Sequence, residues 1–230
     1  FHKCSRQKRC TGSLVCYNKL LHRNGNVYVS GVIANCDAEG KGNCIIENIV
    51  NMANISFTGN NSVFGGIMGG IAGCVALSPF AMGFILVKNC ANYGQLTYSG
   101  TSKQACMGGI VSMYEGEYSG VDYVKNCFNY GSVVHTSVSD MRRIGGIIGK
   151  SVSTTYENCV NVGKIYLSSK SLINDHIGPI VGYTDRNTNL SHCFWTPDIN
   201  FTDICYSVDS RCKWEGSYMV DTLNVTTVSE

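Results

Sequence analysis

The chain has 230 residues, enough for one large domain or for a repeat array with a continuous core. Hydrophobic residues make up 44% of it and charged residues 15%, which excludes an intrinsically disordered chain. A formal net charge of +2 gives no electrostatic basis for nucleic acid as the main partner. The 26 glycines and only 3 prolines favour tight turns between stacked strands over long helices.

Cysteines crowd both ends of the chain. The total of 13 is high for a cytosolic protein, and no Cys-x-x-Cys pair occurs, so the usual spacings of zinc ribbons and thioredoxin-like motifs are absent. We therefore predict disulfides formed in an oxidising compartment, with at least one thiol left over because the count is odd. Residues 1–45 are expected to form a Cys-rich N-terminal cap, and residues 197–230 a C-terminal cap or tail. The candidate cysteines for these caps are Cys4, Cys10, Cys16, Cys36, Cys44, Cys205 and Cys212.

The first 23 residues carry six Lys or Arg and no acidic side chain. This pattern indicates either the solvated face of a cap or a basic patch for glycans and anionic surfaces. The cap is the commoner case, because a stack of strands needs its exposed end covered.

Glycosylation signals point to the secretory pathway. Asn-x-Ser/Thr sequences are acceptors for N-linked glycans, and together with the cysteines they predict an extracellular or cell-surface location. Because the chain begins at Phe1 without a signal peptide, we expect a processed product or a piece of a longer protein. The candidate glycosylation sites are Asn54, Asn60, Asn189, Asn200 and Asn224.

Two linked motifs recur in order through residues 46–196. The first motif, Asn-Cys-x-Asn-x-Gly-x followed by Leu, Val or Ile, begins at Asn89, Asn126 and Asn158. A degenerate copy begins at Asn48, and a broken one covers residues 191–195. Each of the first four copies is followed by Gly-Gly-aliphatic or Gly-Pro-aliphatic, starting at Gly65, Gly108, Gly145 and Gly178. The motif Asn residues are 41, 37 and 32 apart, while the offset to the second motif stays near constant. This pattern predicts a fixed structural layer with variable loops after the Gly-Gly strand.

Each motif position has an expected structural role. Gly supplies the positive φ that a tight corner needs and Asn tolerates it, while stacked Asn side chains satisfy backbone groups and one another. The motif Cys is expected to be a small buried apolar residue, with a metal or redox ladder as the less common alternative. The predicted stacked interior residues are Cys90, Cys127, Cys159 and Cys193. The predicted corner residues are Asn89, Asn92, Gly94, Asn126, Asn129, Gly131, Asn158, Asn161 and Gly163.

The paired motifs resemble those of a known family. Asn-Cys-x-Asn-x-Gly-x-Val followed by Gly-Gly-Ile-Ile-Gly is similar to the GLUG-motif repeat of large surface and secreted proteins. The ending Cys193-Phe194-Trp195 is similar to the close of such arrays. The resemblance covers residues 46–196 and implies an adhesin-like protein with no general catalytic residue set. The fold expected is all-β, a parallel β-solenoid (β-helix) with disulfide-rich end caps.

Two other patterns suggest a membrane span and a phosphate-binding loop, and both interpretations are weak. Residues 62–87 are uncharged and contain Gly-x-x-x-Gly spacings, but Pro79 and the repeat register favour a buried layer over a membrane span. Residues 145–151 resemble a phosphate-binding loop, yet Ile144 stands where that motif needs Gly. We therefore predict no membrane span within this chain, no nucleotide and no other cofactor.

The sequence gives no specific case for catalysis. Gly-x-Ser-x-Gly and His-Glu-x-x-His are both absent, and neither His135 with Asp140 nor Asp175 with His176 has a spacing that singles it out. We expect a non-enzymatic module acting in adhesion or structural assembly. Its partners would be other surface proteins, glycans, or further domains or subunits of the same assembly. The alternatives are a lectin or polysaccharide-active enzyme on a β-helix, and a segment of an extracellular filament or coat.

Contacts are expected in the loops after the Gly-Gly strands, at residues 72–88, 113–125, 150–157 and 183–191. Loops on a rigid repeat scaffold commonly carry recognition. The candidate contact residues there are Phe80, Phe84, Tyr114, Tyr118 and Tyr123.

Overall fold

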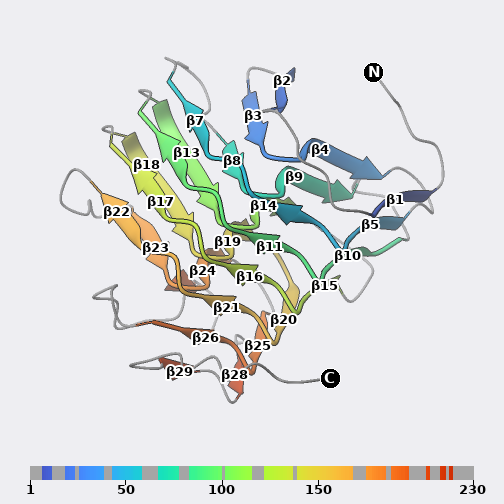
Figure 1. Ribbon diagram of the computed structural model, residues 1–230. Coiled ribbons are helices and arrows are strands. Elements are labelled where there is room, and N and C mark those ends of the chain that lie inside the picture. The colour runs from blue at the N-terminus through green and yellow to red at the C-terminus, as the bar shows by residue number, and fades with distance from the viewer. Residues whose placement is uncertain are drawn as a thin grey trace.

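The computed structural model describes residues 7–11, 19–23, 26–38, 43–58, 67–77, 83–99, 102–115, 122–136, 139–167, 175–184, 188–196, 206–207, 213–215 and 218–219. Every regular element in these residues is a β-strand, so the all-β part of the fold prediction is confirmed. The strands form five sheets, and all neighbouring strands are parallel except the hairpin of β2 (Lys19–Arg23) and β3 (Asn26–Ser30) (Figure 1).

The chain visits the five sheets in a fixed order and then begins again. One passage is called a layer here, and the sheets are numbered 1 to 5 in the order in which a layer visits them. Layer 1 comprises β5 (Asn43–Glu47), β6 (Val50–Asn51), β7 (Ile55–Phe57), β8 (Ile67–Gly69) and β9 (Ala72–Leu77). Layer 2 comprises β10 (Ile85–Lys88), β11 (Ala91–Asn92), β12 (Leu96–Tyr98), β13 (Ser102–Gly108) and β14 (Val111–Glu115).

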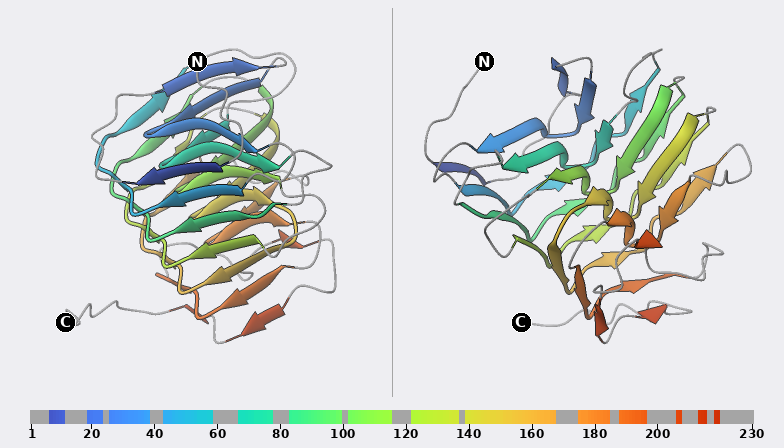
Figure 2. Two further views of the ribbon diagram at one scale, coloured as in Figure 1. Left: turned by 90° about the vertical axis from the view of Figure 1, so that its right-hand side faces the viewer. Right: turned by 180° about the vertical axis from the view of Figure 1, so that it is seen from behind.

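The next two layers repeat this order. Layer 3 comprises β15 (Asp122–Lys125), β16 (Phe128–Asn129), β17 (Val133–His135), β18 (Ser139–Gly145) and β19 (Ile148–Ser151). Layer 4 comprises β20 (Thr154–Glu157), β21 (Val160–Asn161), β22 (Ile165–Leu167), β23 (His176–Gly178) and β24 (Val181–Thr184). The two side views show the layers stacked from the N-terminal to the C-terminal end (Figure 2).

Strands before layer 1 and after layer 4, including strands of both predicted caps, extend the same sheets. At the N-terminal end, β1 (Gln7–Thr11), β3 and β4 (Ile33–Ala38) pair in parallel with layer 1. At the C-terminal end, β25 (Asn189–Ser191), β26 (Phe194–Trp195) and β27 (Tyr206–Ser207) pair with layer 4. β28 (Lys213–Glu215) and β29 (Tyr218–Met219) then pair with β25 and β26.

One disulfide joins two of these strands. Cys36 in β4 bonds to Cys44 in β5, linking sheet 5 to sheet 1 near the N-terminal end. Of the other candidate cap cysteines, Cys10 lies in β1 and its side chain is outside the described set. Cys4, Cys16, Cys205 and Cys212 lie outside the described residues, so their pairing stays a prediction.

Each layer turns between sheets 1 and 2 at the first Asn of the motif. Asn48, Asn89, Asn126 and Asn158 adopt left-handed φ values of 57°, 52°, 51° and 52°. The motif glycines were expected to share this role, and that is wrong, because none of them has a left-handed φ. They are needed for close approach between layers. A Cβ on Gly131 would lie 2.0 Å from the carbonyl oxygen of Gly94, and a Cβ on Gly163 would lie 2.1 Å from that of Gly131.

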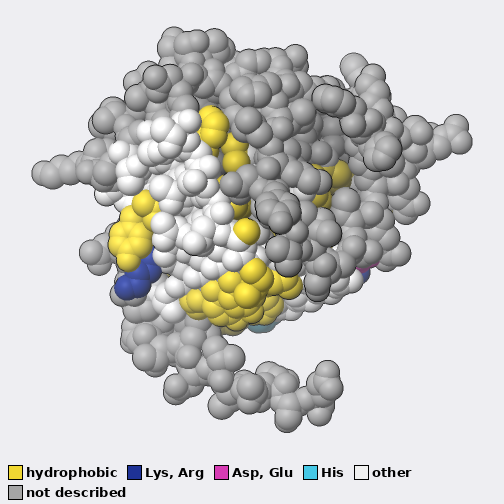
Figure 3. Space-filling view, turned by 45° about the horizontal axis from the view of Figure 1, so that its top comes forward, with side chains coloured by type: hydrophobic (Ala, Val, Ile, Leu, Met, Phe, Trp, Pro, Cys, Tyr) yellow, Lys and Arg dark blue, Asp and Glu magenta, His cyan; other side chains and the backbone are white. Residues whose placement is uncertain are grey.

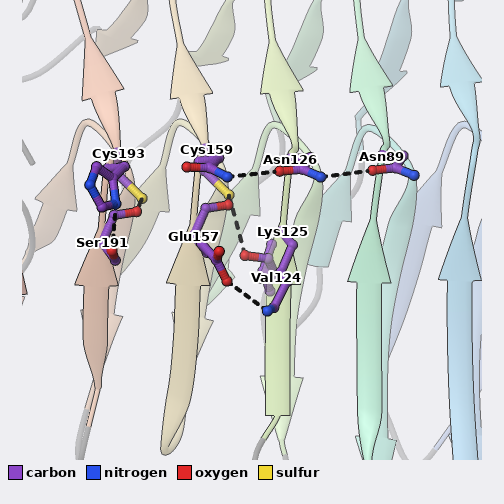
Figure 4. Close-up of polar contacts among 10 residues, drawn as sticks. Asn89, Val124, Lys125, Asn126, Glu157, Cys159, Ser191 and Cys193 are labelled. Carbon is purple, nitrogen blue, oxygen red and sulfur yellow. Dashed lines mark hydrogen bonds and ion pairs between the residues drawn. The ribbon is translucent and has the colours of Figure 1, made fainter.

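Two rows of Asn amides run along the stack. In the exposed row, Nδ2 of Asn126 donates to Oδ1 of Asn89 at 3.1 Å, and Nδ2 of Asn158 donates to Oδ1 of Asn126 at 3.2 Å (Figure 4). In the buried row, Nδ2 donates to Oδ1 of the next layer from Asn51 to Asn92, from Asn92 to Asn129 and from Asn129 to Asn161, at 2.7, 2.8 and 2.8 Å. The same buried Nδ2 atoms also donate to the carbonyls of Ala53, Gly94, Gly131 and Gly163.

The two sequence motifs meet across the interior. In layer 1 the pair is Gly69-Gly70, which is in register with Gly108-Gly109; the sequence prediction that this pair starts at Gly65 is wrong. The second Gly of each pair packs against a buried Asn of the following layer. A Cβ on Gly109 would lie 2.3 Å from Cγ of Asn129, and one on Gly146 would lie 2.2 Å from Cγ of Asn161. The Gly-Gly pair is therefore required by the buried amide row, which leaves no room for a side chain at that point.

The apolar interior is divided into two clusters. The first joins sheets 1 and 5 and the start of sheet 2, and it includes the motif cysteines and the aliphatic residues after Gly-Gly. The second lies between sheets 3 and 4 and includes Leu96, Val133 and Ile144. Strand alternation supplies these side chains: in β10, Ile85 and Val87 are fully buried while Leu86 and Lys88 are half-buried.

The buried and exposed amide rows provide a matched test of stability. Asn129→Leu keeps a similar volume but removes the hydrogen bonds to three neighbouring groups in a fully buried position. We expect a loss of about 2–4 kcal/mol in the free energy of unfolding, because buried polar partners are left unsatisfied. Asn126→Gly is the control. It removes an amide from the exposed row and keeps the left-handed φ, so it should cost less than about 1 kcal/mol. Urea denaturation measures both, and equal losses would contradict the role given to the buried row.

Candidate functional site

Parts of three of the four predicted contact loops fall outside what the structure describes, and the fourth, at residues 150–157, is described throughout. Residues 78–82, 116–121 and 185–187 are not described, so Phe80 and Tyr118 cannot be placed, and Tyr114 is placed by its backbone alone. Phe84 and Tyr123 are half-buried, and the ammonium of Lys125 lies 4.3 Å from the centre of the Tyr123 ring. The contact role of these loops stays a prediction.

Exposed aromatic side chains gather instead on sheet 2. The two variable positions of Asn-Cys-x-Asn-x-Gly point outward there, and in-register pairing repeats them from layer to layer. The aromatic face is defined here as Met52, Tyr93, Phe128 and Tyr130, which are 65%, 48%, 37% and 39% exposed. Half-buried apolar residues continue it, and the space-filling view shows a contiguous hydrophobic patch on this side (Figure 3). They are Val50, Ala91, Val160, Val162 and Phe194.

The rings of this face are stacked on one another. The Tyr93 and Tyr130 rings lie 4.6 Å apart with an interplanar angle of 1°, and the Phe128 ring lies 6.5 Å from that of Tyr130. Partial burial, and to a lesser degree the Tyr93 hydroxyl, raise the pKa of Tyr130. Because neighbouring rings cover each other's faces, solvent meets mainly ring edges and hydroxyl groups.

The aromatic face carries no charged side chain among its described residues. The nearest described charges along the chain precede the corner, on sheet 1, and they are paired with each other. The Lys88 ammonium lies 3.0 Å from the Glu47 carboxylate, and the Lys125 ammonium lies 2.6 Å from that of Glu157 (Figure 4). The described part of the face is therefore uncharged and mainly apolar.

The predicted interior cysteines form a buried row. Cys90, Cys127, Cys159 and Cys193 are fully buried free thiols at equivalent positions of successive layers. Cys127 donates its S–H to the carbonyl of Lys125 at 3.2 Å, and Cys159 to that of Val124 at 3.4 Å. Burial raises the pKa of Cys127 and of Cys159, whereas contact with Cys127 lowers that of Cys90. Contact with Cys159, together with burial, raises the pKa of Cys193.

Metal chemistry gains no support at the thiol row. The described residues contain no group of three or more His, Cys, Asp or Glu side chains that could hold a metal ion. The thiols are buried and donate to carbonyls, as small interior side chains do.

Of the two carboxylate–histidine pairs considered for catalysis, Asp175–His176 is described on both sides, and His135–Asp140 on the histidine side alone. Asp175 is held by Arg142, whose backbone N–H donates to Oδ1 at 3.0 Å and whose Nε donates to Oδ2 at 2.9 Å. Both side chains of that ion pair are fully buried. The His135 ring is buried beside the Tyr98 ring, 5.2 Å between centroids, and the side chain of Asp140 is outside the described set.

Two of the five predicted glycosylation sites lie in described residues, and both are exposed. Asn54 accepts a hydrogen bond through Oδ1 from the backbone N–H of Gln95 at 2.8 Å. This bond does not use Nδ2, the atom to which a glycan is attached. Asn189 opens β25. Asn60, Asn200 and Asn224 fall in parts of the chain that are not described.

The buried thiols predict a pH dependence of stability. A thiol whose pKa is raised on folding keeps its proton in the native state. The contribution of each such thiol to the free energy of unfolding is therefore complete below the unfolded pKa of roughly 8.5. Above that pH it falls by about 1.4 kcal/mol per pH unit. Replacing Cys159 by Ala should flatten this fall between pH 8.5 and 10 by about that slope. Val124→Ala is the control, because it also empties buried volume but removes no proton. Urea midpoints across the pH range measure both, and identical slopes for Cys159→Ala and wild type would refute the prediction.

No helix in the described part of the chain is long and apolar enough to cross a membrane. The uncharged run at residues 62–87 instead contains β8, β9 and the start of β10. Comparison with protein-family models, curated proteins and solved structures found no match. The similarity to the GLUG repeat thus rests on the two motifs quoted above.

Proposed function

We propose that the chain is a parallel β-solenoid module of an extracellular or cell-surface protein, and that it acts in structural assembly or adhesion through its aromatic face. The solenoid assignment is supported by the fixed order in which the chain visits five parallel sheets. Equivalent Asn residues of successive layers pair at separations of 41, 37 and 32 residues. No layer can bury its apolar side chains alone, so stacking is the source of the core.

Two features support the extracellular location. The Cys36–Cys44 disulfide requires oxidising conditions to persist. The candidate glycosylation sites Asn54 and Asn189 are exposed, as a glycan acceptor must be.

The observation that carries the proposed function is the exposed stack of Tyr93 and Tyr130 with Phe128 beside it. Large aromatic side chains left in water at repeated positions mark an interaction surface. The rings are spaced by the strand separation of about 4.8 Å. A second stack of β-strands has the same spacing, so its side chains could match them layer by layer. A second copy of this chain is the simplest such partner, because an uncharged face meets itself without repulsion.

The lectin and enzyme alternatives receive less support from this face. Sugar-binding platforms present flat ring faces, whereas these rings cover one another. The aromatic face also brings no carboxylate pair to its described surface. A filament or coat segment remains compatible with the proposal, since it too would use contacts between stacked modules.

Sedimentation velocity over a range of concentrations tests the proposal. The face has four exposed side chains, far fewer than the roughly 20–30 residues per partner of stable complexes. We therefore expect weak association, with a dissociation constant of roughly 10–1,000 µM. The double variant Phe128→Ser/Tyr130→Ser should remain monomeric throughout. Tyr166→Ser is the matched control, because Tyr166 is 51% exposed but lies in β22 on sheet 3.

A wild-type weight-average mass that stays at the monomer value up to millimolar concentration would refute assembly through a second copy. Association that persists in the double variant would refute the aromatic face as the contact surface. Circular dichroism of both variants checks that the fold is retained.

A further inference from the structure

A second cluster of functional side chains lies where sheets 4 and 5 meet. The Gly-Gly pairs turn the chain from one sheet to the other, and their inner side rests on the buried amide row of sheet 2. Hydrogen bonds close the outer side of this corner. Cys106 donates through Sγ to the carbonyl of Ser112 at 2.9 Å, and Ser112 donates through Oγ to the carbonyl of Cys106 at 2.7 Å. The two sheets meet at an angle here (Figure 2).

Basic side chains follow Cys106 along the same face of sheet 4. Cys106, Arg143 and His176 are register partners in β13, β18 and β23, so their side chains point to the same side. On sheet 5, Lys150 and Tyr183 are register partners in β19 and β24. We name Arg143, Lys150, His176 and Tyr183 the corner cluster.

Tyr183 holds the cluster together. The guanidinium carbon of Arg143 lies 4.8 Å from the centre of the Tyr183 ring, and the His176 ring lies 5.0 Å from it. A cation over an aromatic face is attracted by the ring, and stacking fixes the plane of the guanidinium. The outer edge of Arg143 is thereby positioned beside the imidazole of His176.

Among the described residues, no carboxylate forms an ion pair with Arg143. The closest acid in sequence to His176 is Asp175, which is fully buried and is held by Arg142 from the alternate position of β18. The Nε atom of Arg143 is buried and has no hydrogen-bond acceptor in the described protein. Burial, and then the charge of Arg143, lower the pKa of His176, while Asp175 opposes that shift.

Two basic side chains in register disfavour each other when both are charged. An oxyanion placed between them removes that repulsion and supplies the acceptor that the buried Nε lacks. Arg is the residue best suited to such a ligand, because its fork of donors matches sulfate and carboxylate oxygens.

We propose that the corner cluster binds an oxyanion carried by an acidic glycan, a sulfate ester or a uronic carboxylate. Arg143 and His176 donate hydrogen bonds to the anion, Lys150 adds a second fixed charge from sheet 5, and Tyr183 orients the guanidinium. This site is separate from the aromatic face on sheet 2, so each can fail without the other.

Surface-immobilised glycans of three kinds test the site. The probes are a heparin-derived hexasaccharide, which is sulfated, a hyaluronan-derived hexasaccharide, which carries carboxylates alone, and neutral cellohexaose. The intact chain should bind at least one acidic probe and leave cellohexaose unbound. Binding to heparin alone assigns the ligand to sulfate esters, and binding to both assigns it to oxyanions generally.

Variants separate the corner cluster from general attraction by other basic residues. Arg143→Gln should weaken binding at least roughly tenfold, as expected for loss of a charge-assisted, partly buried contact. Lys164→Gln removes the same charge at an exposed position outside the cluster and should change affinity less than about twofold. Equal affinities of Arg143→Gln and wild type, or equal binding to cellohexaose, would overturn the proposal.

The affinity should also rise as the pH falls from 8 to 5, because a pKa lowered below the usual 6.5 places the protonation of His176 in the acidic part of this range. His176 is neutral at the upper end because its pKa is lowered, and it gains a charge on acidification. The groups that act on it are Arg143, the Tyr183 ring and, through the chain, Asp175. His176→Asn should remove the pH dependence while binding at pH 8 is retained. A pH dependence unchanged in His176→Asn would exclude His176 from the site.

Discussion

The buried row of Asn amides is the interaction on which the rest of this structure depends. A parallel stack turns every layer at the same places, and each turn leaves backbone carbonyls inside the protein where water cannot reach them. One side chain per layer, from Asn51 to Asn161, satisfies a carbonyl of its own turn and the amide of the next layer. The amide fills the space opposite it so closely that only Gly fits there, at Gly70, Gly109 and Gly146. The register of the apolar core follows from this polar contact.

Much of the layer could be predicted from the sequence, because its positions recur. The motif spacing predicted parallel stacking, buried cysteines and stacked amides. The conformational roles within the motif were assigned less well, since Asn and Gly both tolerate a left-handed backbone and only the contacts of a neighbouring layer distinguish them. The break in the repeat is informative in hindsight. Trp195 replaces the buried Asn at the position where Pro179 replaces the second Gly, so the two motifs change together.

The two candidate surfaces were harder to predict for physical reasons. The aromatic face uses the variable positions of Asn-Cys-x-Asn-x-Gly, and the signal was present: Tyr93 and Tyr130 share one position, where Val162 also stands. The motif is defined by its invariant letters, so it does not report what its variable positions share. The corner cluster combines residues from two sheets whose contact depends on the angle between them, and no spacing along the chain reveals that Arg143 and His176 reach the Tyr183 ring.

The two amide rows have opposite polarity. In the buried row each Nδ2 points toward the C-terminal layer, from Asn51 to Asn161, and in the exposed row each points toward the N-terminal layer, from Asn158 to Asn48. Amide dipoles aligned head to tail add up, as they do along an α-helix. Here two antiparallel lines of them run side by side through the same turns, so their fields largely cancel. An added layer lengthens both lines equally, and the array can therefore grow without accumulating an electrostatic cost at its ends.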